Sequence, residues 1–147
     1  MAILFSKNIN KQNLCIDESY VDPNGRWIKL IIRINEKRFR LLCVYAPNNE
    51  AARVKFFVDL QAIVQDDIDA EIIMGGDFNC TMNSIEDRYN CSSKNDVGQV
   101  DLHYLCNLFD LEDIWRRRHP DTQEFTWFGR DKKSRLDFWL TSCQLYD

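Results

Sequence analysis

Long hydrophobic runs and histidines are scarce in this sequence, and there is no excess of basic residues. No apolar run approaches the ~20 residues that a membrane-spanning helix needs. The apolar residues 2–5 are too few for the core of a secretory signal peptide. We therefore expect an intracellular protein, nuclear or cytoplasmic, that is not inserted in a membrane. Internal repeats and low-complexity segments are also absent, which excludes solenoid and fibrous architectures.

The six cysteines include no CxxC pair, the spacing that is typical of many zinc and redox sites. Several lie inside apolar runs, so the sequence favours buried, reduced thiols in an intracellular protein. One alternative is a zinc site with four candidate ligands, Cys80, Cys91, His103 and Cys106. The long and irregular gaps between them match no usual zinc spacing.

The formal net charge of -4 argues against a surface that wraps nucleic acid on all sides. Basic residues nevertheless cluster in two short segments, residues 116–118 and 130–135, with Trp127 and Trp139 nearby in the sequence. Lysine or arginine together with aromatic rings is typical of nucleic-acid surfaces. We favour that interpretation for residues 130–135 and a solvated helix end for residues 116–118.

Length and composition predict one globular domain over residues 1–147. Two-residue alternation and turn signals predict strands at residues 2–6, 13–21, 26–34, 38–45, 71–77, 124–128 and 134–140. Helical spacing predicts helices from residue 50 up to residues 66–69, at 101–108 and at 111–117. Residues 81–97 lack periodicity, which predicts a functional loop with Asp87 and Arg88 as a local ion pair. This order predicts an α/β fold in which a helix crosses over between two parallel strands.

The stretch from Glu71 to Cys80 is an apolar run that stops at two glycines, a carboxylate and an amide. Residues 72–76 are expected to form a central, buried strand. On an extended chain Asp77 and Asn79 would point the same way, while Phe78 turns back into the core. Such a pair can bind a hard cation and a phosphate. A plain turn after the strand is the alternative, because Asp and Asn are common turn residues.

Polar residues also end two other predicted strands, Tyr45 with Asn48 and Arg135 with Asp137. In open α/β sheets, strand ends of this kind commonly form the ligand crevice. We therefore predict that these side chains cluster with Asp77 around one crevice.

Three motifs resemble successive motifs of the endonuclease/exonuclease/phosphatase superfamily. They are Val-Tyr-Ala-Pro-Asn at 44–48, Gly-Gly-Asp-Phe-Asn at 75–79 and Ser-Arg-Leu-Asp-Phe at 134–138. Residues 111–128 resemble more narrowly the apurinic-like endonuclease domain of non-LTR (LINE-type) retrotransposons. The resemblance covers nearly the whole chain. It implies two packed mixed β-sheets flanked by helices, a four-layer, DNase I-like α/β sandwich that is truncated here.

The resemblance implies a role for each matching residue. Asp77 would align or deprotonate the attacking water, Asn79 would hold the scissile phosphate, and Tyr45 would donate to its developing charge. Asp77 and Asn79 would also contact Mg²⁺, with Mn²⁺ as an alternative ion, and Asp137 would orient a catalytic histidine. The predicted substrate contacts are Asn48, Arg135 and Trp127.

Two parts of the family's machinery have no counterpart in this sequence. The metal-binding glutamate and the Ser-Asp-His motif of the family would lie outside the matching region. His103 and His119 precede Asp137, whereas the family's histidine follows its aspartate. The resemblance therefore implies a fragment of the domain with impaired activity.

The leading prediction is a magnesium-dependent DNA endonuclease domain of a retrotransposon, fused to a reverse transcriptase. One alternative is a phosphoesterase of the same fold that acts on small phosphates or lipids. Another is a noncatalytic relic or nucleic-acid-binding module, because a site without its glutamate and histidine loses most of its transition-state stabilisation.

Overall fold

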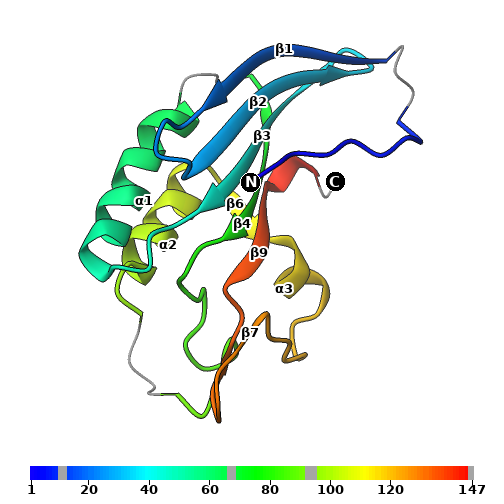
Figure 1. Ribbon diagram of the computed structural model, residues 1–147. Helices are drawn as coiled ribbons and strands as arrows, with labels where there is room; N and C mark the ends of the chain where they lie inside the picture. Colours follow the sequence, from blue (N-terminus) through cyan, green and yellow to red (C-terminus); the bar gives the residue numbers. More distant parts are fainter. Residues whose placement is uncertain (10–12, 66–68, 92–95, 146–147) are drawn as a thin grey trace.

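A twisted six-stranded sheet forms the body of the protein in the computed structural model, which describes residues 1–9, 13–65, 69–91 and 96–145 (Figure 1). In spatial order its strands are β1 (Leu14–Val21), β2 (Trp27–Ile34), β3 (Lys37–Tyr45), β4 (Glu71–Asp77), β9 (Asp137–Ser142) and β6 (Leu111–Asp113). The pair β3–β4 is parallel, whereas the other neighbours are antiparallel. The parallel pair requires a crossover, which helix α1 (Glu50–Gln65) supplies as predicted.

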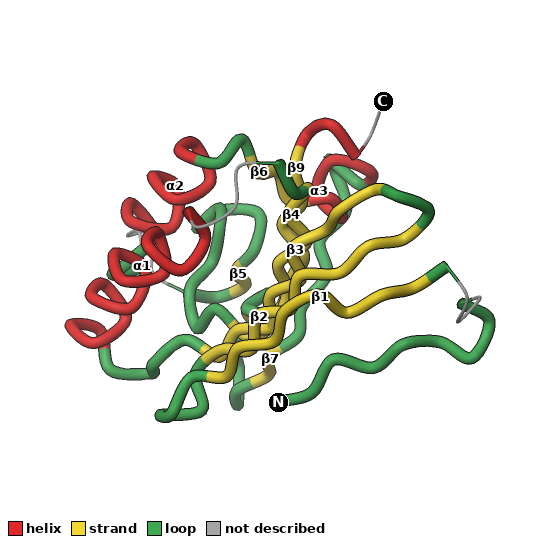
Figure 2. The backbone as a smooth tube through the Cα atoms, turned by 90° about the horizontal axis from the view of Figure 1, so that it is seen from above, coloured by secondary structure: helices red, strands yellow, loops and turns green. Residues whose placement is uncertain are grey.

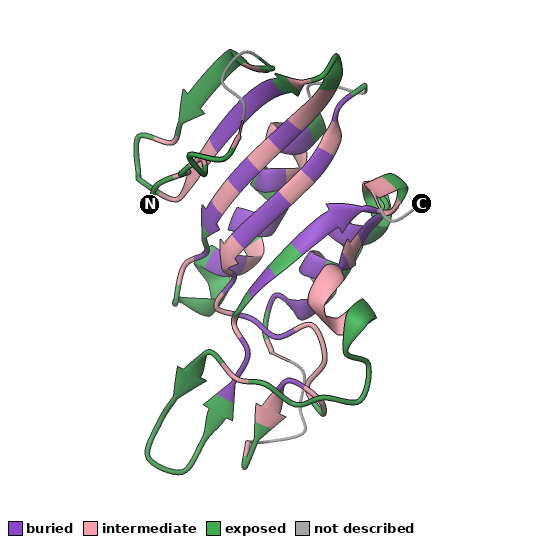
Figure 3. Ribbon diagram, turned by 90° about the vertical axis from the view of Figure 1, so that its right-hand side faces the viewer, coloured by how far each residue is buried: buried purple, intermediate pink, exposed green. Residues whose placement is uncertain are grey.

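Helices α1 and α2 (Gln99–Leu108) lie together on one face of the sheet (Figure 2). The core lies between this face and the helices, where Leu42, Val44 and Met74 of the strands pack with Phe57 and Leu60 of α1. Each of these five side chains is at most 2% exposed. Residues alternate between buried and less buried along β3 and from Asp137 to Leu140 of β9, because successive side chains point to opposite faces (Figure 3).

The face away from the helices carries an apolar groove of about 500 Å³. Phe39, Leu41, Ile73 and Trp139 line it together with residues of the N-terminal segment. The strand predicted at residues 2–6 is wrong, since this segment lies along the groove without strand hydrogen bonds among the described residues. An apolar run signals burial on either a strand or an irregular segment, so its composition could not distinguish the two.

A second, three-stranded sheet lies beyond the ends of β4 and β9 (Figure 1). Its strands are β5 (Arg88–Tyr89), β8 (Lys133–Ser134) and β7 (Trp127–Phe128), in that spatial order. The predicted strand at 134–140 is therefore two strands, separated by Arg135 and Leu136. The predicted strand at 124–128 is shortened to β7.

The remaining elements are helix α3 (Ile114–Arg118) and the 3-10 helix η1 (Cys143–Leu145). The predicted helix at 111–117 begins as strand β6, and Asp113 ends that strand and caps α3. In the described ranges, no helix has the length and apolar character that crossing a bilayer requires. The predicted α/β fold class, mixed sheets with flanking helices, is confirmed.

Candidate active site

Three polar side chains form one row across the ends of three neighbouring strands. Tyr45 of β3 pairs in register with Asp77 of β4, and Asp77 pairs with Asp137, the first residue of β9. Directly opposed residues on adjacent strands point to the same face of a sheet. The row therefore lies on the face away from α1 and α2, because the neighbouring residues Val44 and Phe138 belong to the core under the helices.

Asn79 is tied to this row by a tight turn. The Asp77 Oδ1 atom accepts a hydrogen bond from the Asn79 backbone N at 2.8 Å, and Asn79 has a left-handed backbone with φ of 47°. The Asn79 Nδ2 atom donates to the Ala46 carbonyl at 2.8 Å, next to Tyr45. The predicted proximity of Asp77 and Asn79 thus arises from a turn around the carboxylate, and Phe78 points into the core at 0% exposure, as predicted.

The electrostatics of the row favour a bound proton or cation. Burial raises the pKa of the Asp77 carboxyl above its ordinary value, the Asn79 N–H lowers it, and the Asp137 carboxylate raises it further. Like charges directly opposite each other on adjacent strands destabilise a sheet. A positive ligand between the two carboxylates would remove this repulsion.

Two glycines allow the strands to approach closely beneath the row. A Cβ atom on Gly75 would lie 2.4 Å from the Trp139 ring, and one on Gly76 would lie 2.0 Å from the Val44 carbonyl oxygen. Gly76 also has a φ of 145°, which other residues rarely adopt. The glycine pair of the motif is therefore required by the backbone that presents Asp77.

Asn48 lies beyond the strand ladder, three residues after Tyr45. Its carbonyl accepts a hydrogen bond from Arg53 Nη1 at 3.0 Å, and the residue is exposed. The Tyr45 ring is 39% exposed and lies 5.0 Å from the Arg26 guanidinium. The register brings Tyr45 into the row, while the predicted phosphate contact of Asn48 stays a prediction.

Arg135 is buried, which contradicts its predicted role as a substrate contact. It is 3% exposed, and its Nε and Nη2 donate to Asp87 and Asp113 at 2.9 and 2.5 Å. The guanidinium also lies 5.3 Å from the ring centres of Trp115 and Phe138. The prediction assumed a regular strand through residues 134–140, but the chain leaves the strand at Arg135.

Arg116, predicted to lie at a solvated helix end, joins the same buried cluster. Its Nη2 donates to Asp87 at 2.8 Å, and its Nη1 donates to three carbonyls of residues 119–122. Asp113 accepts from the Arg116 backbone N at the start of α3. The predicted Asp87–Arg88 pair is wrong, because Asp87 belongs to this cluster and Arg88 pairs with Asp96 at 3.0 Å. The sequence signal for this cluster was Asp113, a helix-capping residue placed three residues before Arg116.

Comparisons with known proteins bear on the family and the fold of the chain. No protein-family model matches the chain. It is 36% identical over 118 residues, 77% of its length, to an uncharacterized 149 kDa protein of transposon TX1 from Xenopus laevis. It resembles an AP endonuclease from Archaeoglobus fulgidus with a TM-score of 0.71 at 16% identity, covering 88% of this chain and 60% of that one. The catalytic domain of Xenopus laevis APE2 gives a TM-score of 0.61 at 21% identity, covering 82% and 47%.

The chain belongs to the family of the transposon TX1 protein, and its fold is of the endonuclease/exonuclease/phosphatase type that the AP endonuclease structures share. A humanized D. rerio TDP2 also shares the fold, with a TM-score of 0.60, 17% identity and coverage of 90% of this chain and 53% of that one. The chain spans 9% of the transposon protein and about half of the three solved structures. Identities this low to the solved structures establish the shared fold alone.

The oxygen donors of the polar row suit a hard cation, but they are few. Asp77 keeps Oδ2 for a ligand after Oδ1 accepts from Asn79, and the Asn79 side chain keeps its carbonyl oxygen. Within the described part of the chain, no group of three or more His, Cys, Asp and Glu side chains could hold a metal. Mg²⁺ requires near-octahedral coordination, so water or another segment would have to complete it.

The same result excludes the zinc alternative among the described residues. Cys80 and Cys106 are buried as free thiols, and burial raises the pKa of each thiol to about 12. His103 contacts the Met82 carbonyl oxygen at 2.9 Å. All six cysteines are free of disulfides, but the predicted burial is found for Cys80 and Cys106 alone, since Cys15 is exposed and Cys43, Cys91 and Cys143 are half-buried.

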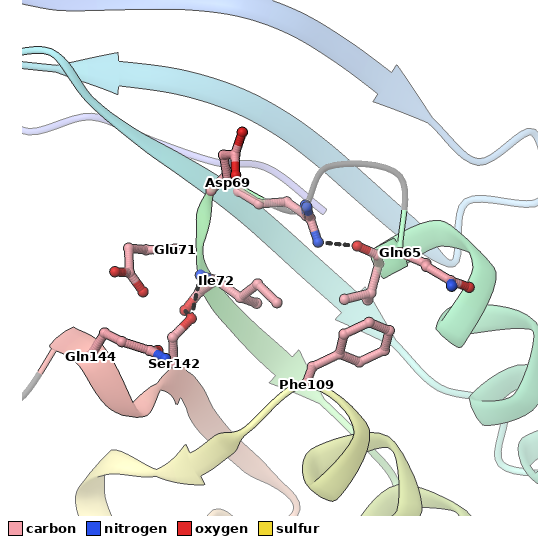
Figure 4. A pocket seen from close by; sticks show the side chains of 10 residues that line it. Gln65, Asp69, Glu71, Ile72, Phe109, Ser142 and Gln144 are labelled. Carbon is pink, nitrogen blue, oxygen red and sulfur yellow. Dashed lines mark hydrogen bonds between the residues drawn. The ribbon is translucent and has the colours of Figure 1, made fainter.

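A polar pocket of about 400 Å³ lies at the other end of β4 from Asp77 (Figure 4). Arg40, Gln65, Asp69 and Glu71 are among the residues that line it. Because Glu71 begins the strand that Asp77 ends, the length of β4 separates this pocket from the polar row. It belongs to a different part of the molecule from the candidate site.

Proposed function

We propose that this domain is part of a magnesium-dependent DNA endonuclease that hydrolyses phosphodiester bonds. The observation that carries the proposal is the row of Tyr45, Asp77 and Asp137 in register, with Asn79 turned against Asp77. A phenol, two carboxylates and an amide at one sheet edge suit phosphoryl chemistry better than acyl transfer, because they offer oxygen ligands for a hard cation.

Each residue has a role that its contacts support. Asp77, whose pKa burial raises, is suited to align or accept a proton from the attacking water. The turn at Asn79 fixes that carboxylate, and the Tyr45 hydroxyl can donate to charge developing on the phosphate. Asp137 is an acceptor for a catalytic histidine contributed from elsewhere in the protein. Thr126 holds it in place, since the Thr126 Oγ1 accepts from the backbone N of Asp137 at 3.1 Å.

Mg²⁺ would be held by Asp77 and Asn79, with Mn²⁺ as an alternative ion. When bound, it would stabilise negative charge on the phosphate oxygens. Two protein ligands give weak occupancy, because Mg²⁺ loses its water reluctantly. We therefore expect low activity from residues 1–147 and full activity from a longer protein whose added segments supply further ligands.

DNA is the substrate that the exposed basic residues favour. Arg130 and Lys132 are exposed on the turn between β7 and β8, and Lys133 is exposed at the start of β8, in the same hairpin as Trp127 at 46% exposure. Clustered cations attract the phosphate backbone even on a chain with a net charge of -4. The similarity to a protein of transposon TX1 supports a role in transposition, in which fusion to a reverse transcriptase is part of the proposal.

A plasmid-nicking assay tests the function. Residues 1–147 and a version extended on both sides are compared with Mg²⁺ and with EDTA. We expect EDTA-sensitive nicking by the extended protein, and a loss on the order of 10²- to 10⁴-fold when Asp77→Ala or Asp137→Ala is introduced. Asp59→Ala, an exposed carboxylate of α1, is the matched control and should leave the rate unchanged. Absence of nicking in every version, with DNA binding retained, would instead favour a noncatalytic nucleic-acid-binding module.

A further inference from the structure

The small sheet presents a row of aromatic and basic side chains on one face. Lys133 of β8 pairs in register with Tyr89 of β5 on one side and with Phe128 of β7 on the other. Opposed residues on neighbouring strands share a face, so the three side chains lie side by side. The other register row contains Arg88, Ser134 and Trp127, and it lies on the opposite face. Ser134 is thus buried on one face of the small sheet, and the rings of Tyr89 and Phe128 are exposed on the other.

The lysine ammonium lies among three aromatic rings. Lys133 Nζ is 5.5 Å from the ring centre of Tyr89, 5.7 Å from Phe125 and 5.9 Å from Phe128, all within the range of cation–π attraction. Tyr89 is 54% exposed and Phe128 is 63% exposed. Two exposed rings held on a sheet surface favour binding of a flat ligand, because water solvates the faces of aromatic rings poorly.

The surroundings of this row are basic. Arg130 and Lys132 are exposed on the turn that joins β7 to β8, beside the row. Strand β8 is followed after two residues by Asp137 of the candidate active site. Thr126, directly before β7, accepts hydrogen bonds from the backbone N atoms of Leu136 and Asp137, so a DNA strand bound at that site would lie near the small sheet.

We propose that Tyr89, Phe128 and Lys133 form a stacking platform for unpaired nucleobases of single-stranded DNA. The proposal rests on DNA being the substrate of the neighbouring site, and it adds that the DNA is unpaired there. An incoming base stacks on a ring and takes the place of the ammonium. The flexible lysine then turns outward to a phosphate, so a weak exposed cation–π contact is exchanged for base stacking and a charge contact.

Unpaired DNA fits this surface because base faces are available for stacking only outside the duplex. A paired base has its faces covered by its neighbours, so it must be unstacked before it can contact a ring. Stacking on aromatic residues tolerates every base, because each has a π-face. We therefore expect the platform to discriminate unpaired from paired DNA and to show little preference for base sequence.

The test is binding of fluorescent oligonucleotides in EDTA, measured by anisotropy with the extended protein and with residues 1–147. Single-stranded DNA and a duplex with a central bubble should bind more tightly than the intact duplex. Phe128→Ala and Tyr89→Ala should each weaken single-strand binding about 5- to 150-fold and duplex binding much less. Lys133→Met keeps an apolar stem between the rings, and it should reduce the slope of log Kd against log salt by roughly 0.7.

Tyr104→Ala is the matched control, because Tyr104 is a 57% exposed aromatic residue of α2 that lies outside this sheet. It should leave binding unchanged. Equal effects of Phe128→Ala and Tyr104→Ala, or equal affinity of the parent protein for single strands and duplex, would overturn the proposal. Far-UV circular dichroism checks that the variants stay folded. Binding in EDTA does not depend on cleavage, so the two proposals can fail separately. If the platform variants bind single strands like the parent protein while the protein nicks DNA, the platform alone is refuted. If the variants weaken single-strand binding but no version nicks DNA, the nuclease function alone is refuted.

Discussion

Replacing Gly76 by alanine tests whether the close contact between β3 and β4 is required by the fold. Gly76 lies directly before Asp77, and its added Cβ would lie 2.0 Å from the Val44 carbonyl oxygen and 2.9 Å from the Val44 N atom. Both partners are backbone atoms of a paired strand, so neither can rotate away. The two strands would have to separate locally by roughly 1 Å from their usual ~4.8 Å spacing.

Two unfavourable terms add up in this variant. A non-glycine residue at a φ of 145° is strained by roughly 1–3 kcal/mol. Overpacking against a strand that cannot move freely adds roughly 1–3 kcal/mol. We expect Gly76→Ala to lower the free energy of unfolding by roughly 2–6 kcal/mol, a large part of the ~5–15 kcal/mol typical of a domain.

Gly25→Ala is the control, because Gly25 also has a positive φ, 69°, but a Cβ there meets nothing within 4 Å. Its strain of roughly 1–2 kcal/mol is partly offset by the reduced entropy of the unfolded chain. Urea unfolding followed by tryptophan fluorescence compares the two variants with the parent. If Gly76→Ala unfolds at the same urea concentration as Gly25→Ala, the strand contact is not restrictive and the reasoning fails.

Three further predictions concern charge. Burial raises the pKa of Asp77, so the ionised carboxylate destabilises the folded state at pH 7. Asp77→Asn should therefore raise the urea midpoint at pH 7, and the difference from the parent should disappear as the pH falls through the Asp77 pKa. Arg135→Met removes the guanidinium partner of the buried Asp113 and leaves the buried Asp87 with Arg116 alone, so it should destabilise the protein by roughly 3–5 kcal/mol, against less than ~1 kcal/mol for Arg117→Met at an exposed pair. A thiol reagent at pH 8 should leave Cys80 and Cys106 unmodified until urea unfolds the chain, because each has a pKa of about 12. Equal urea midpoints of Asp77→Asn and the parent at both neutral and acidic pH would contradict the first prediction. Equal losses of unfolding free energy for Arg135→Met and Arg117→Met would contradict the second, and modification of all six cysteines in the native protein would contradict the third.

The sequence predicted those elements whose signals are local. Strands β1 to β4 lie within a residue of the predicted bounds, since alternation and the turn at residues 22–25 specify them without reference to distant contacts. Helices α1 and α2 follow from apolar residues at helical spacing, because one stripe of each must pack on the sheet.

The meeting of the three residues in the candidate site could not be predicted from any local pattern. Tyr45, Asp77 and Asp137 are neighbours because β4 lies between β3 and β9 in a defined register. Pairing between strands 30 to 60 residues apart is a property of the whole sheet. The motif resemblance predicted the residues, and the sheet order explains why they meet.

Arg135 shows why side-chain direction was harder to predict than strand position. Alternation applies only while the chain stays extended, and it placed Arg135 beside Asp137 in a crevice. Two buried carboxylates, Asp87 and Asp113, draw the guanidinium into the protein instead. Both acids come from segments distant in sequence, so the competition between a phosphate and these partners could not be judged from residues 134–138 alone.

The polar row lies on the same face of the sheet as the apolar groove. Tyr45 continues the face of Phe39 and Leu41, and Asp77 continues the face of Ile73, because residues two apart on a strand point the same way. The apolar groove and the polar row are thus two parts of one surface, which neither α1 nor α2 covers. A segment that packs on the Trp139 end of the groove would lie close to Asp77, because Trp139 pairs in register with Gly75, two residues before Asp77, so the segment that stabilises the sheet could also bring oxygen ligands to the row. Stability and nicking should therefore increase together when the domain is extended, rather than one at the expense of the other.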